Sequence, residues 1–211
     1  SATLATGKSF NFIRERLGLD EANELLLDSP FDYETQAMLY LPGDSIPDPS
    51  YEPLNYSEKM LEETERLLRI TQGRTFVLFT NYAMLIRAYN YFRDKLADLV
   101  FLKQGDLPRW QLLDKFKKGE NAVLLGTNTF WQGVDVPGKA LECVVITKLP
   151  FAVPDEPITE AKMEYLSTEG KDPFIYYQIP QAIIMLKQGF GRLIRSKQDH
   201  GIVALLDPRI K

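Results

Sequence analysis

The sequence predicts an α/β fold in which a mostly parallel sheet carries helices on both faces. Short apolar runs alternate along the chain with longer amphipathic stretches, an order typical of strands joined by crossover helices. Several of the short runs are apolar at every position, as in strands that are buried on both faces. The chain has 211 residues, of which 45% are apolar and 26% charged, so it is long enough for one large domain.

Each element is expected from its own pattern. Strands are predicted from β-branched, aromatic or aliphatic runs at 36–41, 74–80, 99–102, 121–127, 142–148 and 201–207. Helices are predicted from apolar side chains recurring every three to four residues at 55–71, 81–97, 108–118, 155–167 and 173–196, the last split or bent around Pro180 and Gly189. Asn55 and Glu58 have the spacing of a capping box. The proline-rich stretch 42–53 is expected to be a loop within one domain.

The composition excludes several classes of protein. Acidic residues outnumber basic ones by 29 to 25, so the chain has no general basic coat for nucleic acid or an anionic membrane. The lone Cys143 and His200 cannot form an internal disulfide, an iron–sulfur site or a His-rich metal site. No apolar run reaches the roughly 18 residues of a membrane span, and the first residues lack the layout of a secretion signal. We expect a reducing, cytoplasmic setting.

The segment 75–82 ends an apolar strand in Thr80 and Asn81 and continues at once as a helix. Parallel sheets bind ligands at the carboxyl edge of their strands, and free backbone N–H groups at a helix start favour a phosphate. The structural alternative is that Thr80 or Asn81 only caps the helix. This segment by itself leaves the two interpretations open.

The segment 124–138 opens a strand into a loop with glycines, hydroxyl groups and one carboxylate. Thr127 can approach a phosphate backbone there while Asp135 is directed at a sugar hydroxyl. The structural alternative is that Gly133 only supplies a positive φ and that Phe130 and Trp131 are core residues. The sequence pattern by itself favours the functional and the structural interpretations of this segment equally.

The segment 187–196 contains Arg192 and Arg195, which project from one face if a helix continues through them, with Gln188 one turn below Arg192. Two guanidinium groups pointing the same way suit the distributed charge of a polyphosphate. The alternative is a solvated basic face. Against it stand the two glycines of this segment, each of which costs a helix about 1 kcal/mol relative to alanine.

Positive charge gathers near the end of the chain, because residues 187–211 hold six basic residues against two acidic ones. The chain lacks a G-x-x-x-x-G-K-[ST] phosphate loop, and no Asp-Glu pair ends a strand to hold magnesium. Gly7 and Lys8 match only the tail of such a loop, without its first glycine or a preceding strand. The sequence therefore predicts contact with a nucleotide, but not the means to hold its phosphates and metal alone.

Taken in order, these segments resemble the second motor domain of superfamily 2 helicases, and within them the DinG/XPD-type DNA helicases. The matching stretches are 1–4 with motif III, 29–33 with the entry to the second RecA-like domain, 74–82 with motif IV, 103–105 with the strand end after it, 126–138 with motif V, 148–151 with the segment after that, and 188–195 with motif VI. The form Phe-Trp-Gln-Gly-Val-Asp-Val-Pro-Gly in motif V points to this subfamily. The resemblance implies a RecA-like, three-layer α/β/α fold.

The resemblance also implies roles for individual residues. Motif VI implies Arg195 as an arginine finger and Arg192 as a second γ-phosphate contact, with Gln188 near the nucleotide or the domain interface. Motif V implies Gly133 and Asp135 on the ribose side and Thr127 on a nucleic-acid phosphate. Motif IV implies Thr80 and Asn81 on the backbone of a single strand, with Gln104 as a further candidate.

The function implied is that of the carboxyl half of an ATP-dependent DNA helicase. Residues 1–211 are expected to form the second RecA-like domain, with 1–28 a lead-in from a first motor domain that the chain lacks, so that Ser1 marks a cut through a longer enzyme. ATP with magnesium, held mainly by that missing domain, and single-stranded DNA are the expected cofactor and partner, with no membrane and no iron–sulfur cluster in this chain. The chain alone is expected to be inactive. The alternative is a non-catalytic RecA-like module that binds nucleic acid or a protein.

Overall fold

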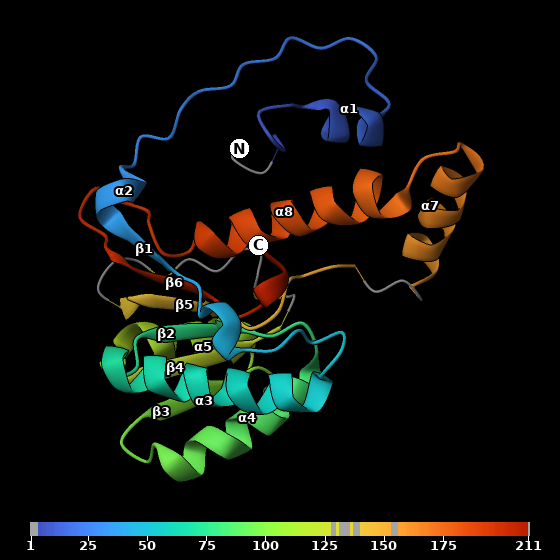
Figure 1. Ribbon diagram of the computed structural model, residues 1–211. Coiled ribbons are helices and arrows are strands. Elements are labelled where there is room, and N and C mark those ends of the chain that lie inside the picture. Colours follow the sequence, from blue (N-terminus) through green and yellow to red (C-terminus); the bar gives the residue numbers. More distant parts are fainter. Residues whose placement is uncertain (1–3, 128–129, 131–135, 137–139, 153–155, 211) are drawn as a thin grey trace. The chain divides into compact units, whose positions relative to one another are not determined.

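Figure 1 shows the computed structural model of the chain, which describes residues 4–127, 130, 136, 140–152 and 156–210. The chain forms two compact units. The sheet unit consists of residues 31–149 and 189–211, and the helical unit of residues 1–30 and 150–188. All the predicted strands belong to the sheet unit.

The sheet unit is built on six described strands that all run parallel. They are β1 (Ala37–Tyr40), β2 (Thr75–Leu78), β3 (Val100–Lys103), β4 (Ala122–Gly126), β5 (Cys143–Ile146) and β6 (Gly201–Leu205), in the spatial order β1-β6-β5-β2-β4-β3. The predicted parallel sheet is confirmed, and every predicted strand lies within two residues of its expected bounds. Strands β2, β4 and β5 are buried at every position, as their unbroken apolar runs predict.

The register brings the carboxyl ends of three neighbouring strands to one edge. Leu78 at the end of β2 pairs with Gly126 at the end of β4, and Lys103 at the end of β3 pairs with Leu125. The residues that follow these strands are therefore neighbours in space although they are more than twenty positions apart in the sequence. Thr80, Gln104 and Thr127 are such residues.

The helices of the sheet unit are α2 (Tyr33–Gln36), α3 (Pro53–Thr71), α4 (Tyr82–Lys95) and α5 (Arg109–Lys118), with 3-10 turns at Gly43–Ser45 and Pro208–Ile210. Helix α3 begins two residues earlier than predicted, because Pro53 occupies its first turn, where a fixed φ and a missing N–H cost nothing. The predicted capping box is therefore wrong. Asn55 lies inside the helix, and its amide donates to the carboxylate of Glu52 at 2.8 Å.

Helices α3 and α4 pack side by side against one face of the sheet (Figure 1). Their buried side chains form one apolar cluster with alternate residues of the strands, including Met60, Leu68, Leu85, Phe92, Val77, Val123 and Val145. Phe76 on β2 lies outside this cluster and packs edge to face against Phe130, with ring centroids 6.1 Å apart. The sheet is thus buried on both sides, as a three-layer α/β/α fold requires.

The helical unit contains α1 (Asn11–Leu17), α7 (Pro157–Thr168), a π-helical turn (Phe174–Gln178) and α8 (Ile179–Phe190), whose last two residues belong to the sheet unit. The predicted break near Pro180 corresponds to the change from π-helix to α-helix at Ile179. The predicted helical continuation to residue 196 is wrong, because α8 ends at Phe190. Among the described helices, none is long and apolar enough to cross a membrane.

Candidate functional site

Two of the predicted DNA-contact residues are hydrogen bonded to each other at the carboxyl edge of the sheet. The side-chain oxygen of Gln104, just after β3, accepts from the backbone N–H of Thr127 at 2.7 Å and from its hydroxyl at 3.0 Å. The backbone N–H of Gln104 in turn donates to the carbonyl of Leu125 on β4 at 2.9 Å. The ends of β3 and β4 are therefore joined by both backbone and side chains.

Asn81 caps the amino end of α4. Its side-chain oxygen accepts from the backbone N–H of Met84 at 2.8 Å, and its own backbone is extended, as an N-cap requires. The capping interpretation, which the sequence left open, is confirmed for Asn81. Thr80 precedes it and is half-buried. A contact of either residue with DNA stays a prediction.

Tyr82, which sequence reasoning did not single out, connects α4 to the strand end at Gln104. Its hydroxyl donates to the carbonyl of Gln104 at 3.1 Å. Gly105 has a φ of +99°, and a Cβ there would lie 2.7 Å from the Tyr82 hydroxyl oxygen. The glycine after the strand was the available sequence signal, since only glycine combines this φ with so close an approach.

Arg192 and Arg195 lie in a loop and not on one face of a helix, which corrects the sequence prediction. After Phe190 the chain turns, with the N–H of Arg192 bonded to the carbonyl of Gly189 at 3.2 Å. Leu193 and Ile194 are buried, so apolar packing draws the chain into the core at this point. Gln188 lies on α8 in the helical unit.

A buried carboxylate closes the arginine loop. Asp199 accepts from the backbone N–H groups of Arg195 and Ser196, each at 2.9 Å, and from the Ser196 hydroxyl at 2.9 Å. Burial alone would raise the pKa of Asp199, but these hydrogen bonds outweigh it and hold that pKa below its ordinary value. The carboxylate is therefore the form that the loop stabilises.

Burial also acts on the two arginines. Partial burial lowers the pKa of Arg192, and the nearby positive charge of Arg109 lowers it further. Burial likewise lowers the pKa of Arg195, which the charge of Asp199 partly offsets. Guanidinium groups stay protonated even so. The neighbouring charges of Arg192 and Arg109 favour an anion beside them.

Arg109, the first residue of α5, was missed by sequence reasoning. Its guanidinium lies over the ring of Phe130, 5.4 Å from the centroid. Phe130 is buried, so its interpretation as a core residue is confirmed. Gly126 makes room for it, because a Cβ on Gly126 would lie 2.8 Å from the Phe130 Cβ. Gly133, Asp135 and Trp131 lie outside the described residues.

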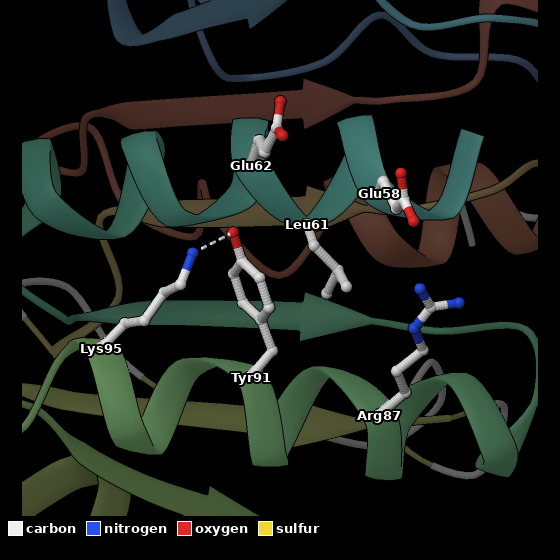
Figure 2. A pocket seen from close by; sticks show the side chains of 6 residues that line it. All are labelled: Glu58, Leu61, Glu62, Arg87, Tyr91 and Lys95. Carbon is white, nitrogen blue, oxygen red and sulfur yellow. Dashed lines mark hydrogen bonds between the residues drawn. The ribbon is translucent and has the colours of Figure 1, made fainter. Parts of the chain in front are cut away.

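A surface groove of about 340 Å³ lies elsewhere, between α3 and α4 (Figure 2). Helix α3 contributes Glu58, Leu61 and Glu62 to it, and α4 contributes Arg87, Tyr91 and Lys95. Figure 2 shows the ammonium group of Lys95 donating to the Tyr91 hydroxyl, at 2.7 Å. The groove contains none of the nucleotide- or DNA-contact residues predicted from the sequence. Over the described part of the chain, no group of three or more His, Cys, Asp or Glu side chains could hold a metal ion.

Comparison with known proteins identifies the family. Residues 64–211 match the family described as "Helicase C-terminal domain", and the chain belongs to that family. Together with the relatives below, this match makes the chain the C-terminal helicase domain of a DinG/XPD-type superfamily 2 helicase, as its motifs indicated.

Two curated relatives and one solved structure illustrate the match. The chain is 42% identical over 210 residues to "ATP-dependent DNA helicase YoaA" of Haemophilus influenzae, covering all of this chain and 32% of that protein. It is 36% identical over 223 residues to "3'-5' exonuclease DinG" of Bacillus subtilis, covering all of this chain and 23% of that protein. The structure "XPD_APO" superposes with a TM-score of 0.75 at 17% identity, over 95% of this chain and 42% of that one, which shows the shared RecA-like fold. The chain thus spans a third or less of the length of these curated relatives.

Proposed function

We propose that this chain acts as the second motor domain of an ATP-dependent DNA helicase. In this proposal it supplies an arginine finger and single-strand contacts to a cleft shared with a first motor domain of the same polypeptide. The observation that carries the proposal is the loop that contains Arg192 and Arg195. Asp199 holds the backbone of this loop by hydrogen bonds, and the chain is a member of the helicase C-terminal domain family. Its relatives named as ATP-dependent DNA helicases agree with this function.

ATP is the proposed substrate, with magnesium held mainly by the first motor domain. Arg195 places its positive charge against the γ-phosphoryl group as negative charge develops there, and Arg192 gives a second contact. Gly133 and Asp135 are proposed to lie on the ribose side, and Gln188 near the nucleotide. Hydrolysis then closes and opens the cleft between the two motor domains.

The strand edge is proposed to hold single-stranded DNA. Thr80, Asn81, Gln104 and Thr127 offer hydroxyl and amide groups, which can bond to phosphate oxygens without reading the bases. The two bonds that Thr127 donates to the Gln104 side-chain oxygen support this role, because they fix the Gln104 amide and so direct its NH₂ group before any ligand binds. The Thr127 hydroxyl would exchange its bond to Gln104 for one to a phosphate oxygen. Binding and release of DNA phosphates at this edge would move the DNA strand each time the cleft closes and opens. A cytoplasmic location is part of this proposal.

The decisive experiment is Arg195→Ala in the full-length protein that contains this chain. We expect DNA-stimulated ATP hydrolysis to fall by about 10³-fold or more, since arginine fingers contribute on the order of 10³ to 10⁵ in rate. Lys197→Ala, an exposed residue of the same loop, is the matched control and should leave turnover unchanged. Turnover within a few fold of wild type for Arg195→Ala would contradict the finger assignment and favour a non-catalytic binding module.

A second test uses the 211-residue chain alone. It should bind single-stranded DNA weakly, with an affinity that falls as salt rises, and should hydrolyse no measurable ATP, because the proposed phosphate and metal contacts of the first motor domain are absent. Robust hydrolysis by the isolated chain would overturn the proposal that the site is shared.

A further inference from the structure

Gln36 joins the start of the sheet to the arginine loop, 160 residues further along the chain. Its side-chain amide donates to the carbonyl of Ser196 at 2.8 Å and to the carbonyl of Asp199 at 2.9 Å. Its side-chain oxygen accepts from the backbone N–H of Asp32 at 3.0 Å. Only 5% of Gln36 is exposed. Both donors and the acceptor of this buried side chain are therefore bonded to backbone groups, as buried polar groups require.

Asp199 holds the same loop from the other side. It binds the two consecutive N–H groups of Arg195 and Ser196, while Gln36 binds the carbonyls of Ser196 and Asp199 itself. Donors and acceptors of the loop backbone are therefore both occupied by buried side chains. Such a double attachment reduces the backbone freedom of the loop at residues 195, 196 and 199.

The attachment begins at the backbone nitrogen of Arg195, the atom next to the carbon from which its side chain leaves. Because Asp199 also holds the backbone nitrogen of Ser196, the peptide groups on both sides of this carbon are held, which limits the direction of the first side-chain bond. A guanidinium group is some six bonds further out, so a small rotation at the backbone becomes a displacement of ångström size at its tip. Displacements of that size cost a catalytic group on the order of 10²-fold in rate.

We infer that Gln36 and Asp199 are positioning residues for Arg195, and that together they hold the arginine finger in its working direction before the nucleotide binds. This inference rests on the proposed function of Arg195. Neither residue is proposed to contact the phosphate groups of ATP or the DNA strand. They act through the loop backbone, in the way that supporting hydrogen bonds orient the groups of a preorganised site.

Asp199→Ala and Gln36→Glu in the full-length protein test the inference. Alanine removes both oxygens of Asp199 and with them the bonds to the backbone N–H groups of Arg195 and Ser196, and glutamate keeps the shape of Gln36 but cannot donate to the two carbonyls. Each variant should lower the kcat of ATP hydrolysis by about 10- to 100-fold while the KM for ATP stays within about twofold. Gln198→Glu, an exposed position in the same loop, is the matched control and should change neither.

Two further readouts separate positioning from a loss of folding. Affinity for ADP with aluminium fluoride, which imitates the transferring phosphoryl group, should fall in proportion to kcat, whereas affinity for ADP alone should not change. The Arg195→Ala variant supplies the second readout, because Asp199→Ala should lower kcat no further in that background. Circular dichroism and thermal unfolding identify any variant that fails to fold. Ser196→Ala then gives a milder test with a kcat loss of severalfold, because it removes the hydroxyl bonds to Asp199 and to the N–H of Gln198 but keeps both backbone bonds to Asp199.

The outcomes distinguish the inference from the function on which it rests. If Arg195→Ala lowers kcat but Asp199→Ala lowers it equally in the wild-type and Arg195→Ala backgrounds, the positioning role is overturned and the finger stands. An equal loss of affinity for ADP and for its aluminium fluoride complex overturns the positioning role in the same way. If Arg195→Ala leaves kcat unchanged, the finger assignment fails, and the positioning role fails with it.

Discussion

Replacing Asp207 by asparagine removes the charge from a buried carboxylate of the sheet unit that accepts four hydrogen bonds. Asp207 follows β6 and is 1% exposed. One of its oxygens accepts from the backbone N–H of Leu149 at 2.9 Å and from Arg209 Nη2 at 2.7 Å. The other accepts from the Nε of Arg209 at 2.9 Å and from its backbone N–H at 3.1 Å. The carboxylate thus joins the segment after β5 to the turn after β6.

The cost of Asp207→Asn follows from these bonds. An asparagine has one oxygen, so it can keep one pair of donors, and its NH₂ group then faces the other pair. Leaving a buried donor unsatisfied costs about 1 to 3 kcal/mol, and breaking a buried ion pair about 3 to 5 kcal/mol. Because the Arg209 side chain is 25% exposed, water can solvate part of its freed charge. We therefore expect a loss of about 3 kcal/mol in the free energy of unfolding.

Urea and thermal unfolding of the 211-residue chain, followed by circular dichroism, measure this loss. At about 2 to 4 °C per kcal/mol for a chain of this size, the midpoint should fall by roughly 6 to 12 °C. Asp114→Asn is the matched control, because Asp114 also pairs with a basic residue, Lys118 at 2.7 Å, but half of its side chain is exposed. The free energy of unfolding of this control variant should fall by less than about 0.5 kcal/mol. Equal losses for the two variants would refute the argument from burial.

The remaining predictions concern pH, a backbone contact and the strand edge. Hydrogen bonds hold the pKa values of Asp199 and Asp207 below the ordinary 3.8, against the opposing effect of burial, so their stabilisation is complete above that pH and is lost as the pH falls through the lower folded values. Urea unfolding at pH 7 and pH 3 checks this, and Asp207→Asn should lose less on acidification than the parent chain does. Gly73→Ala should cost about 2 to 4 kcal/mol, because Gly73 has a φ of +88° and a Cβ there would lie 2.4 Å from the carbonyl carbon of Asn121. Gly43→Ala, with a φ of +66° and open space around it, should cost only about 1 to 2 kcal/mol, and equal losses in urea would contradict the contact argument. Gln104→Ala should cost about 1 kcal/mol and, in the full-length protein, weaken binding to a labelled single strand severalfold, whereas the exposed Gln198→Ala should do neither. Unchanged DNA affinity for Gln104→Ala would argue against the strand-edge site.

Sequence patterns were sufficient for the architecture. Alternation of apolar runs with amphipathic stretches predicted the parallel sheet and its helices, because burial on one or two faces imposes those periods directly on the chain. The rule that parallel sheets bind ligands at their carboxyl edge singled out Thr127, and the motif resemblance added Gln104. The structure places these two residues in hydrogen-bond contact. The ordered motifs indicated the helicase family, which the comparisons confirmed.

Predictions from neighbouring residues alone were wrong at two helix ends. In one case distant packing ended the helix, and in the other a different residue began it. The spacing of Arg192 and Arg195 suggested one helical face, but burial of Leu193 and Ile194 turns the chain after Phe190 instead. Asn55 had the spacing of a cap, yet Pro53 had already begun the helix. The periodicity of apolar residues predicts that a helix exists, but tertiary contacts decide where its last turn lies.

What the sequence determined by itself is the fold, the family and the segments that carry the chemistry, since each depends on residues that are close together in the chain. The tertiary structure alone decided which polar groups hold those segments in place. Gln36 meets the loop of Asp199, and Leu149 meets Asp207, across 163 and 58 positions of the sequence. A buried donor must find an acceptor wherever the fold brings one, and only the assembled sheet places these pairs within 3 Å of each other.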